Sequence, residues 1–104
     1  MVFHNVELTG PANVYFDGRV SSRTFYTADG ERMTLGFILA GEYTFNAEYR
    51  EHLEILAGSL EVAMDDADTY TRYEVGGTFD IPAGSAAHMR TDSFADYSCG
   101  YLIP

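Results

Sequence analysis

The sequence predicts one all-β domain, and three observations support that prediction. From Val14 onward, short segments rich in β-branched and aromatic residues alternate with turn signals about every 8–12 residues, a spacing typical of a sandwich or barrel. At 104 residues the chain has the size of a single domain. Its 46% hydrophobic residues can form one core without disulfides or a structural metal. The turn signals are Asp17-Gly18, Asp29-Gly30, Gly41, Gly58, Asp65-Asp66, Gly76-Gly77 and Pro82-Ala83-Gly84.

The first residues of the chain do not share this pattern. Residues 1–12 have no hydrophobic period and end in Gly10-Pro11, which favours a loop. We expect them to form a loose arm that is poorly ordered or lent to a neighbouring molecule. The β-barrel domain then covers residues 13–104.

The clearest strand is Met33–Leu39, in which apolar residues occupy every odd position. We therefore expect the odd positions to face the core. The same parity continues further along the chain, where we expect a hairpin that turns at Gly58 and carries Glu54 and Glu61 on its outer face. Its inward residues would be Leu53, Ile55, Leu60, Val62 and Met64. A helix over Asn46–Leu56 is the alternative, which Gly58 and the β context disfavour.

Charge limits the partners that the chain can have. The formal net charge is −10, with sixteen acidic residues against six basic ones, and it repels a phosphate backbone. Nucleic acid is therefore disfavoured, and a site for an anionic ligand must be built locally from arginines, hydroxyls and backbone N–H groups. The basic residues are all arginines: Arg19, Arg23, Arg32, Arg50, Arg72 and Arg90.

Targeting signals are not evident in the sequence. The N-terminus lacks a basic segment followed by an apolar run, and no stretch is apolar enough to predict a membrane span. Cys99 is the only cysteine, so no internal disulfide can form, which suits a reducing compartment. We expect a cytoplasmic protein with no membrane partner.

Two groups of residues form a pattern in the middle and last thirds of the chain. In the first group, Glu51 precedes Gly58 by seven residues, after the segment Gly41-Glu42-Tyr43-Thr44-Phe45. In the second, Gly76 is followed by Pro82-Ala83-Gly84 and then by His88. Together they resemble the sequence motifs of cupins, which are small jelly-roll barrels. The resemblance implies an all-β, single-domain, cupin-type barrel.

Metal-binding cupins carry His-x-His shortly before that glutamate, because a transition metal is held by two imidazoles and a carboxylate. Here the matching positions hold Thr44, Phe45, Asn46 and Ala47. His88 also lies one residue later than the motif expects, which in a strand turns its side chain to the other face. We expect no metal and no other cofactor.

A more specific resemblance covers residues 15 to 102 and rests on seven strings. They are Tyr15-Phe16-x-Gly18-Arg19-Val20, Arg32-x-x-x-Gly36, Gly41-Glu42-Tyr43-Thr44-Phe45, Leu60-x-Val62, Tyr73-x-x-Gly76-x-x-Phe79, Pro82-x-x-Ser85-x-x-His88 and Tyr97-x-Cys99-x-Tyr101-Leu102. In this order and spacing, the strings are similar to the pyrimidine/purine nucleoside phosphorylase family of small cupin-fold bacterial proteins. The resemblance implies a pentosyltransferase of nucleoside salvage, which converts purine and pyrimidine nucleosides plus phosphate, as co-substrate, into free base and ribose 1-phosphate without a metal. Gly100 stands where the family usually has an arginine.

Phosphorolysis requires an anion site, and three residues are candidates for it. Arg32 and Arg19 lie in family-matching strings, and a guanidinium can hold phosphate with two hydrogen bonds. Ser85 can offer its hydroxyl and neighbouring N–H groups to the same anion. The alternative is two surface arginines and a serine that only makes a turn.

Two residues are candidates for catalysis. The parity of Glu51 places its carboxylate inside the barrel, where it could accept hydrogen bonds from ribose hydroxyls. His88 could donate a proton to the leaving base or to phosphate. Each also has a structural alternative, a buried ion pair for Glu51 and a hydrogen-bonded structural histidine for His88.

Three aromatic residues, Tyr43, Phe45 and Phe79, could stack on a base of either class. Core packing is the alternative for all three. A non-catalytic or differently catalytic cupin that binds a sugar or small acid is the alternative for the whole chain, since one fold supports many functions. We also expect a two-fold homodimer, because an open barrel of this size leaves strand edges and apolar surface uncovered.

Overall fold

Nine strands form one antiparallel sheet in the computed structural model, which describes residues 1–104. The all-β prediction is confirmed, and the only helical segment is a short 3-10 turn, η1 (Phe16–Gly18). No helix is long and apolar enough to span a bilayer. The strands are β1 (Glu7–Leu8), β2 (Asn13–Tyr15), β3 (Val20–Tyr26), β4 (Arg32–Asn46), β5 (Arg50–Gly58), β6 (Leu60–Met64), β7 (Thr71–Tyr73), β8 (Thr78–Ile81) and β9 (Ala86–Leu102).

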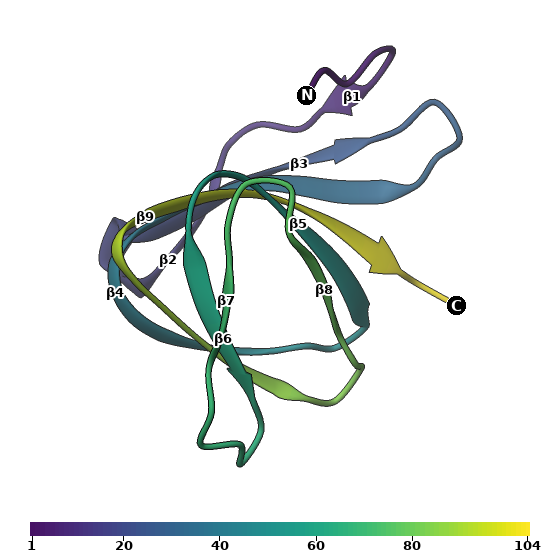
Figure 1. The fold of residues 1–104 in the computed structure, drawn as a ribbon. Coiled ribbons are helices and arrows are strands. Elements are labelled where there is room, and N and C mark those ends of the chain that lie inside the picture. The colour runs from purple at the N-terminus through teal and green to yellow at the C-terminus, as the bar shows by residue number, and fades with distance from the viewer.

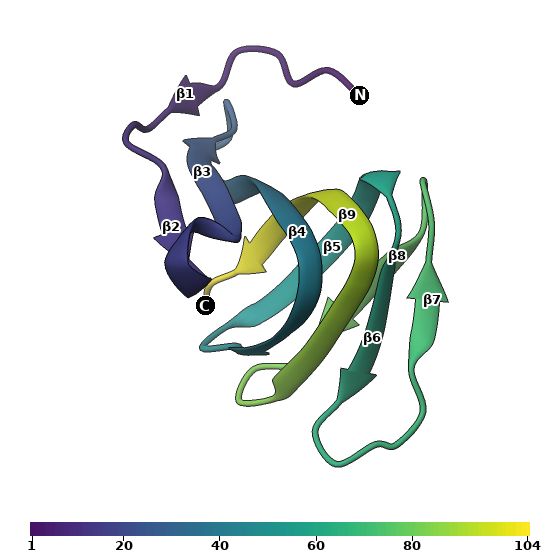
Figure 2. The same cartoon turned by 90° about the vertical axis from the view of Figure 1, so that its left-hand side faces the viewer.

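Two long strands, β4 and β9, organise the sheet. They contain 15 and 17 residues and pair with each other along most of their length. The C-terminal part of β9 also pairs with β5, and its N-terminal part pairs with β6. Figure 1 shows the sheet curling around an interior with β4 on one side and β8 on the other, and Figure 2 shows β4, β9 and β5 side by side. The curl makes a cupin-type barrel that is not fully closed.

The N-terminal arm lies against its own sheet. Glu7 and Leu8 of β1 pair with the end of β3. The ring of Phe3 packs 4.9 Å, centroid to centroid, from the ring of Phe25, whose side chain is almost fully buried. The arm therefore covers the outer side of β3 within the same molecule.

The inward parity predicted for the middle of the chain is confirmed. Leu53 and Ile55 of β5 and Leu60 and Val62 of β6 are all buried in one hydrophobic cluster on the concave face. Glu54 and Glu61 lie between them in sequence and are only half-buried. The helix alternative for Asn46–Leu56 is wrong, because residues 50–56 belong to β5 and Asn46 ends β4.

The parity predicted for Met33–Leu39 is wrong. Ile38 is fully buried, whereas Phe37 and Leu39 are 38% and 47% exposed, so even positions face the core in this part of β4. A shift of register between Leu39 and Gly41 then reverses the parity, because one extra residue turns the following side chains over. Beyond the bulge the odd residue Tyr43 is buried. Neither face of Met33–Leu39 carries a charged residue, so alternation alone does not tell which face is exposed.

The predicted hairpin at Gly58 is also wrong. Strands β5 and β6 do not pair with each other, since β5 pairs with β8 and β9 while β6 pairs with β7 and β9. At Gly58 the chain instead passes from one part of β9 to another, and the N–H of Ser59 donates to the carbonyl oxygen of Phe94 at 3.1 Å. Gly58 has a φ of 74°, and a Cβ there would lie 2.2 Å from the same oxygen. Only glycine fits this crossing.

We predict that Gly58→Ala destabilises the protein by at least about 2 kcal/mol more than Gly30→Ala does. Both glycines have positive φ, which costs a non-glycine residue about 1–2 kcal/mol, but a Cβ at Gly30 would meet no atom within 4 Å. The difference therefore isolates the contact with the Phe94 carbonyl. Urea unfolding of both variants measures it, and equal free energies of unfolding would contradict this role for Gly58.

Candidate functional site

A cavity of about 310 Å³ opens into the concave face of the sheet. Side chains from β4, β5 and β9 form its floor, and the turn between β4 and β5 contributes part of its wall. Two of the predicted site residues that line it, Arg32 and Glu51, are charged. Arg32 also lines a wider cavity of about 930 Å³, but Glu51 does not, so the smaller cavity is the one that brings the two together.

Strand register explains why these side chains converge. Tyr101 of β9 lies opposite Glu51 of β5, and two residues earlier Cys99 lies between Leu53 of β5 and Thr34 of β4. Residues two apart on a strand share a face, so Tyr97, Cys99 and Tyr101 all point inward from β9. Their three side chains line the cavity.

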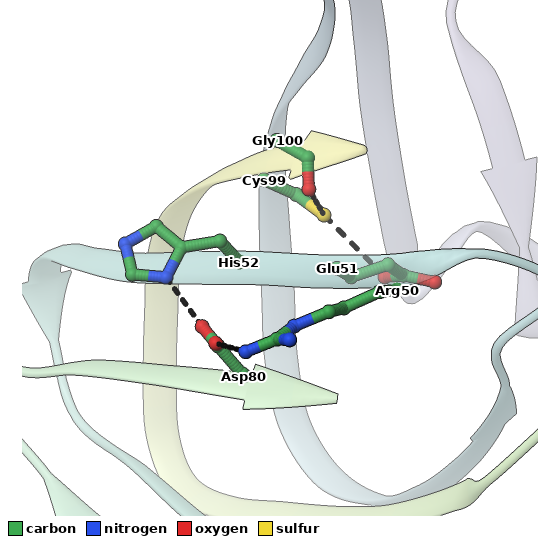
Figure 3. A network of polar contacts seen from close by, with 6 residues as sticks. All are labelled: Arg50, Glu51, His52, Asp80, Cys99 and Gly100. Carbon is green, nitrogen blue, oxygen red and sulfur yellow. Dashed lines mark hydrogen bonds and ion pairs between the residues drawn. The ribbon is translucent and has the colours of Figure 1, made fainter. Parts of the chain in front are cut away.

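Glu51 is a mostly buried acid with one weak partner. The thiol of Cys99 donates to its Oε1 at 3.4 Å (Figure 3). Burial raises the pKa of Glu51, because desolvation penalises the charged form more than the Cys99 hydrogen bond and the Arg32 charge favour it. Burial likewise raises the pKa of the Cys99 thiol, which therefore stays protonated and can donate. Glu51 can thus accept hydrogen bonds from a polar ligand or share its own proton with one.

Arg32 carries a charge that no acidic side chain neutralises. Its guanidinium carbon lies 4.5 Å from the centroid of the Tyr101 ring, and it forms no ion pair in the chain. The Tyr101 hydroxyl is fixed in turn by Thr34 Oγ1 at 3.2 Å. By contrast, Arg50, Arg72 and Arg90 are each paired with a carboxylate. Arg32 is therefore available to an anion that enters the cavity.

The aromatic candidates separate into one cavity residue and two core residues. Phe45 lines the cavity. Tyr43 is buried in the core, and its hydroxyl donates to the carbonyl oxygen of Leu39 at 2.9 Å. Phe79 is also buried, with its ring stacked on that of Tyr73 at 4.6 Å. The structure thus brings Phe45, and not Tyr43 or Phe79, to Arg32 and Glu51.

Arg19 lies away from the cavity, at the end of η1. Its guanidinium carbon lies 5.3 Å from the centroid of the Tyr43 ring, and a Cβ on Gly41 would lie 2.4 Å from its Nη2. The two predicted phosphate-binding arginines are therefore not neighbours in the fold.

His88 and Ser85 also lie outside the cavity and hold loops together. His88 alternates with the buried residues Ala87 and Met89, so it faces outward. Its Nε2 lies 2.9 Å from the carbonyl oxygen of Asp65, which can only accept, so Nε2 carries a proton. In the neutral ring Nδ1 then accepts from the Thr44 hydroxyl, 2.9 Å away.

The Pro82-Ala83-Gly84 turn supports the cavity from outside. The N–H of Ala47 donates to the carbonyl oxygen of Ser85 at 3.0 Å, and the N–H of Gly84 donates to the carbonyl oxygen of Ala47 at 2.8 Å. These two bonds hold the β4–β5 turn, whose neighbouring residues Asn46, Glu48 and Tyr49 form part of the cavity wall.

Position 100 faces the outer side of β9. A Cβ on Gly100 would meet only the His52 carbonyl oxygen and the Met33 side chain, both about 4 Å away. An arginine there would therefore point away from the Glu51 cavity and toward the outer surface, where Arg32, His52, Asp80 and Gly100 line the cavity of about 930 Å³. On that surface Arg50 and His52 both bind Asp80 (Figure 3), and the Arg50 hydrogen bond, followed by that of His52, lowers the pKa of Asp80.

Sequence reasoning missed several cavity residues. Tyr97, Cys99 and Tyr101 alternate along β9, and this period of two would have placed them on one face. The signal was present in the family-matching string Tyr97-x-Cys99-x-Tyr101, but only the register with β5 shows that this face is the one that carries Glu51.

The family model, a relative of similar sequence and two solved structures were compared with this chain. The family model described as pyrimidine/purine nucleoside phosphorylase matches residues 11–101. A protein of that name from Syntrophotalea carbinolica is 45% identical, over 96% of both chains. A crystal structure of a protein of unknown function from Acinetobacter sp. ADP1 has a TM-score of 0.93 and 32% identity, and the match covers 97% of this chain and 98% of that one. The EutQ protein of Clostridium difficile shares the fold alone, with a TM-score of 0.66 and 16% identity over 79% of this chain and 61% of that one.

We predict that Glu51→Gln stabilises the fold, and that the gain grows as the pH rises from about 4 to 7. The folded protein binds this proton more tightly than the unfolded chain does, so the contribution of Glu51 to the wild-type free energy of unfolding falls as the pH rises above 4.5. Glutamine does not titrate, so the free energy of unfolding of the variant lacks this decrease.

Urea unfolding at several pH values measures the difference between wild type and variant. Glu54→Gln, on the outer face of the same strand, is the matched control for removing a carboxylate from β5. A Glu51→Gln difference that shrinks with rising pH would contradict the burial of this carboxyl.

Proposed function

Because the chain belongs to the pyrimidine/purine nucleoside phosphorylase family, we propose that it catalyses phosphorolysis of purine and pyrimidine nucleosides, giving free base and ribose 1-phosphate. The observation that carries this proposal is the presence of unpaired Arg32 and mostly buried Glu51 in one cavity. Arg32 can bind the attacking phosphate, and Glu51 can bind the ribose.

The reaction is a substitution at C1′ of the ribose. A phosphate oxygen forms a bond to C1′ while the bond from C1′ to the base nitrogen breaks, and the electron pair of that bond leaves with the base. The base takes up a proton, and nothing is oxidised or reduced. The protein's contribution is to hold phosphate and sugar in line and to stabilise the positive charge that develops on the ribose.

Arg32 is the proposed phosphate ligand. A guanidinium binds two phosphate oxygens at once, and that geometry suits an anion that must be oriented as well as bound. Tyr101 holds the guanidinium from one side through the cation–π contact. In a chain of net charge −10, an arginine that lines the cavity and has no acidic partner supplies the local positive charge that an anion needs.

Glu51 is the proposed ligand of the ribose hydroxyls. Carboxylate oxygens accept hydrogen bonds from a diol, and the negative charge also favours the positive charge that develops on the sugar in the transition state. Phe45 offers a ring face to the base, and stacking of this kind does not discriminate between purine and pyrimidine. Stacking on Phe45 would therefore allow the site to accept both purine and pyrimidine nucleosides.

A nucleoside panel with and without phosphate tests the proposal most simply. Uridine and inosine should both release base only when phosphate is present, with one phosphate consumed per base. Prolonged treatment with a chelator should leave the rate unchanged, because the chain lacks the His-x-His ligands of metal cupins. No release of base under any condition would overturn the proposal in favour of a cupin that binds a sugar or small acid.

We predict that Arg32→Ala raises the KM for phosphate roughly ten- to a hundredfold while changing the KM for nucleoside much less. A charge-assisted hydrogen bond contributes about 1.5–3 kcal/mol, and this variant removes it from one substrate only. Arg19→Ala is the matched control, since Arg19 also lacks an acidic partner but lies outside the cavity. Steady-state kinetics would contradict the assignment if Arg19→Ala, and not Arg32→Ala, raised the phosphate KM.

We also propose that the protein forms a two-fold dimer through the outer face of β4 and β9. Phe37 and Leu39 of β4 and Phe94 of β9 are exposed there, and the rings of Phe37 and Phe94 stack at 5.6 Å. Exposed aromatic residues in a cluster mark surfaces that another protein covers.

Phe37→Asp should convert the dimer into a monomer near 11.5 kDa, because each copy would place a charge in the apolar contact. Val75→Asp, at an exposed position in the turn between β7 and β8, should leave the dimer intact. Light scattering at micromolar concentration measures both masses. A monomeric wild type, or a dimeric Phe37→Asp variant, would contradict this interface.

A further inference from the structure

Three tyrosines of the concave face differ in how their hydroxyls are used. The Tyr43 hydroxyl donates to the Leu39 carbonyl, and the Tyr101 hydroxyl pairs with Thr34. The Tyr97 hydroxyl has no hydrogen-bond partner in the chain. Every fully buried side-chain oxygen or nitrogen does have a partner, so the Tyr97 hydroxyl is not fully buried. It is accessible from the cavity that Tyr97 lines. Of the three, only Tyr97 offers a free hydroxyl.

The ring of Tyr97 occupies the space that a side chain at Gly36 of β4 would fill. Tyr97 lies opposite Gly36, and a Cβ on Gly36 would lie 2.2 Å from the Cζ of the ring and 2.4 Å from its hydroxyl oxygen. The ring therefore lies flat across Gly36, with its hydroxyl end over β4. Ser22 of β3, the next residue in the same row of the sheet, also lines the cavity.

Packing explains the ring of Tyr97 but not its hydroxyl. A phenylalanine would cover Gly36 equally well, and a hydroxyl in a mostly buried position loses hydration unless something replaces it. Burial, followed by the neighbouring Tyr101, Cys99 and Glu51, raises the pKa of Tyr97, so the phenol stays neutral and can donate as well as accept.

We propose that Tyr97 is a sugar-binding residue, whose hydroxyl forms a hydrogen bond with one hydroxyl of the nucleoside's ribose. The inference rests on the proposed function and deepens it by adding a second sugar ligand beside Glu51. Phosphate fits less well beside the Tyr97 hydroxyl, because the charge of Glu51 acts on Tyr97 and a carboxylate repels an anion. A sugar hydroxyl carries no charge and matches a neutral phenol as donor or acceptor.

The test compares Tyr97→Phe with wild type on uridine and on its 2′-, 3′- and 5′-deoxy analogues. We expect kcat/KM for uridine to fall roughly three- to tenfold, the loss of one neutral hydrogen bond, with the melting temperature unchanged. The loss should disappear for the one analogue that lacks the contacted hydroxyl, because that substrate never formed the bond. It should be the same for uridine and inosine, whose sugars are identical.

Tyr73→Phe is the matched control, because Tyr73 packs on Phe79 outside the cavity and should show no loss on any substrate. Calorimetric titration of uridine in the absence of phosphate, with both the wild type and Tyr97→Phe, gives a readout that needs no catalysis. Weaker uridine binding by Tyr97→Phe would support the inference even if the wild type released no base, so failure of the proposed function is recognised separately.

Three results would overturn the inference. The first is unchanged uridine binding and kcat/KM in Tyr97→Phe. The second is a loss that persists on all three deoxy analogues, and the third is a loss that differs between uridine and inosine but not among sugars. The last result would assign the hydroxyl to the base.

Discussion

The pairing of β4 with β9 is the constraint on which the rest of the structure depends. It extends from Met33 opposite Gly100 to Asn46 opposite Ala86, and it includes one bulge, between Leu39 and Gly41. Because β9 continues this pairing on its other edge with β5 and then with β6, every other strand of the concave face takes its position from these two. The bulge allows β4 to present Ile38 and Tyr43 to the same core although their parity differs.

The same pairing explains why the cavity contains both a cation and a buried acid. Arg32 begins β4, Glu51 lies near the start of β5, and β9 separates the two strands with Tyr101. An isolated carboxyl in such a position is costly, and the weak Cys99 contact does not offset that cost, which is why burial raises the pKa of Glu51. Polar groups held at this cost and without full internal partners are typical of ligand sites.

The sequence was informative where one face of a strand is clearly polar. Leu53 and Ile55 could be assigned to the core because Glu54 lies between them, and Glu51 followed from their parity. Met33–Leu39 could not be assigned in this way, because neither of its faces carries a charged residue that would mark the exposed side. The predicted hairpin failed because β6 pairs with β7, the strand that follows it, and with β9 near the end of the chain, and not with β5.

The candidate site was predicted in part, for a related reason. Arg32, Phe45 and Glu51 line the cavity, whereas Arg19, Tyr43, Phe79, Ser85 and His88 belong to the core, to loops or to the outer surface. Family motifs mark residues that matter for the fold as well as for the chemistry, and only the position in the sheet separates the two. The family identity was predictable from the order and spacing of the strings, since those reflect the whole chain.

The central claim is that the Arg32–Glu51 cavity is where phosphate and nucleoside meet. A crystal structure of the protein with phosphate and a nucleoside bound tests it most directly. The account predicts phosphate within hydrogen-bond distance of the Arg32 guanidinium and ribose beside Glu51. Both ligands bound on the outer surface near Arg50, His52 and Asp80, with the cavity empty, would contradict it.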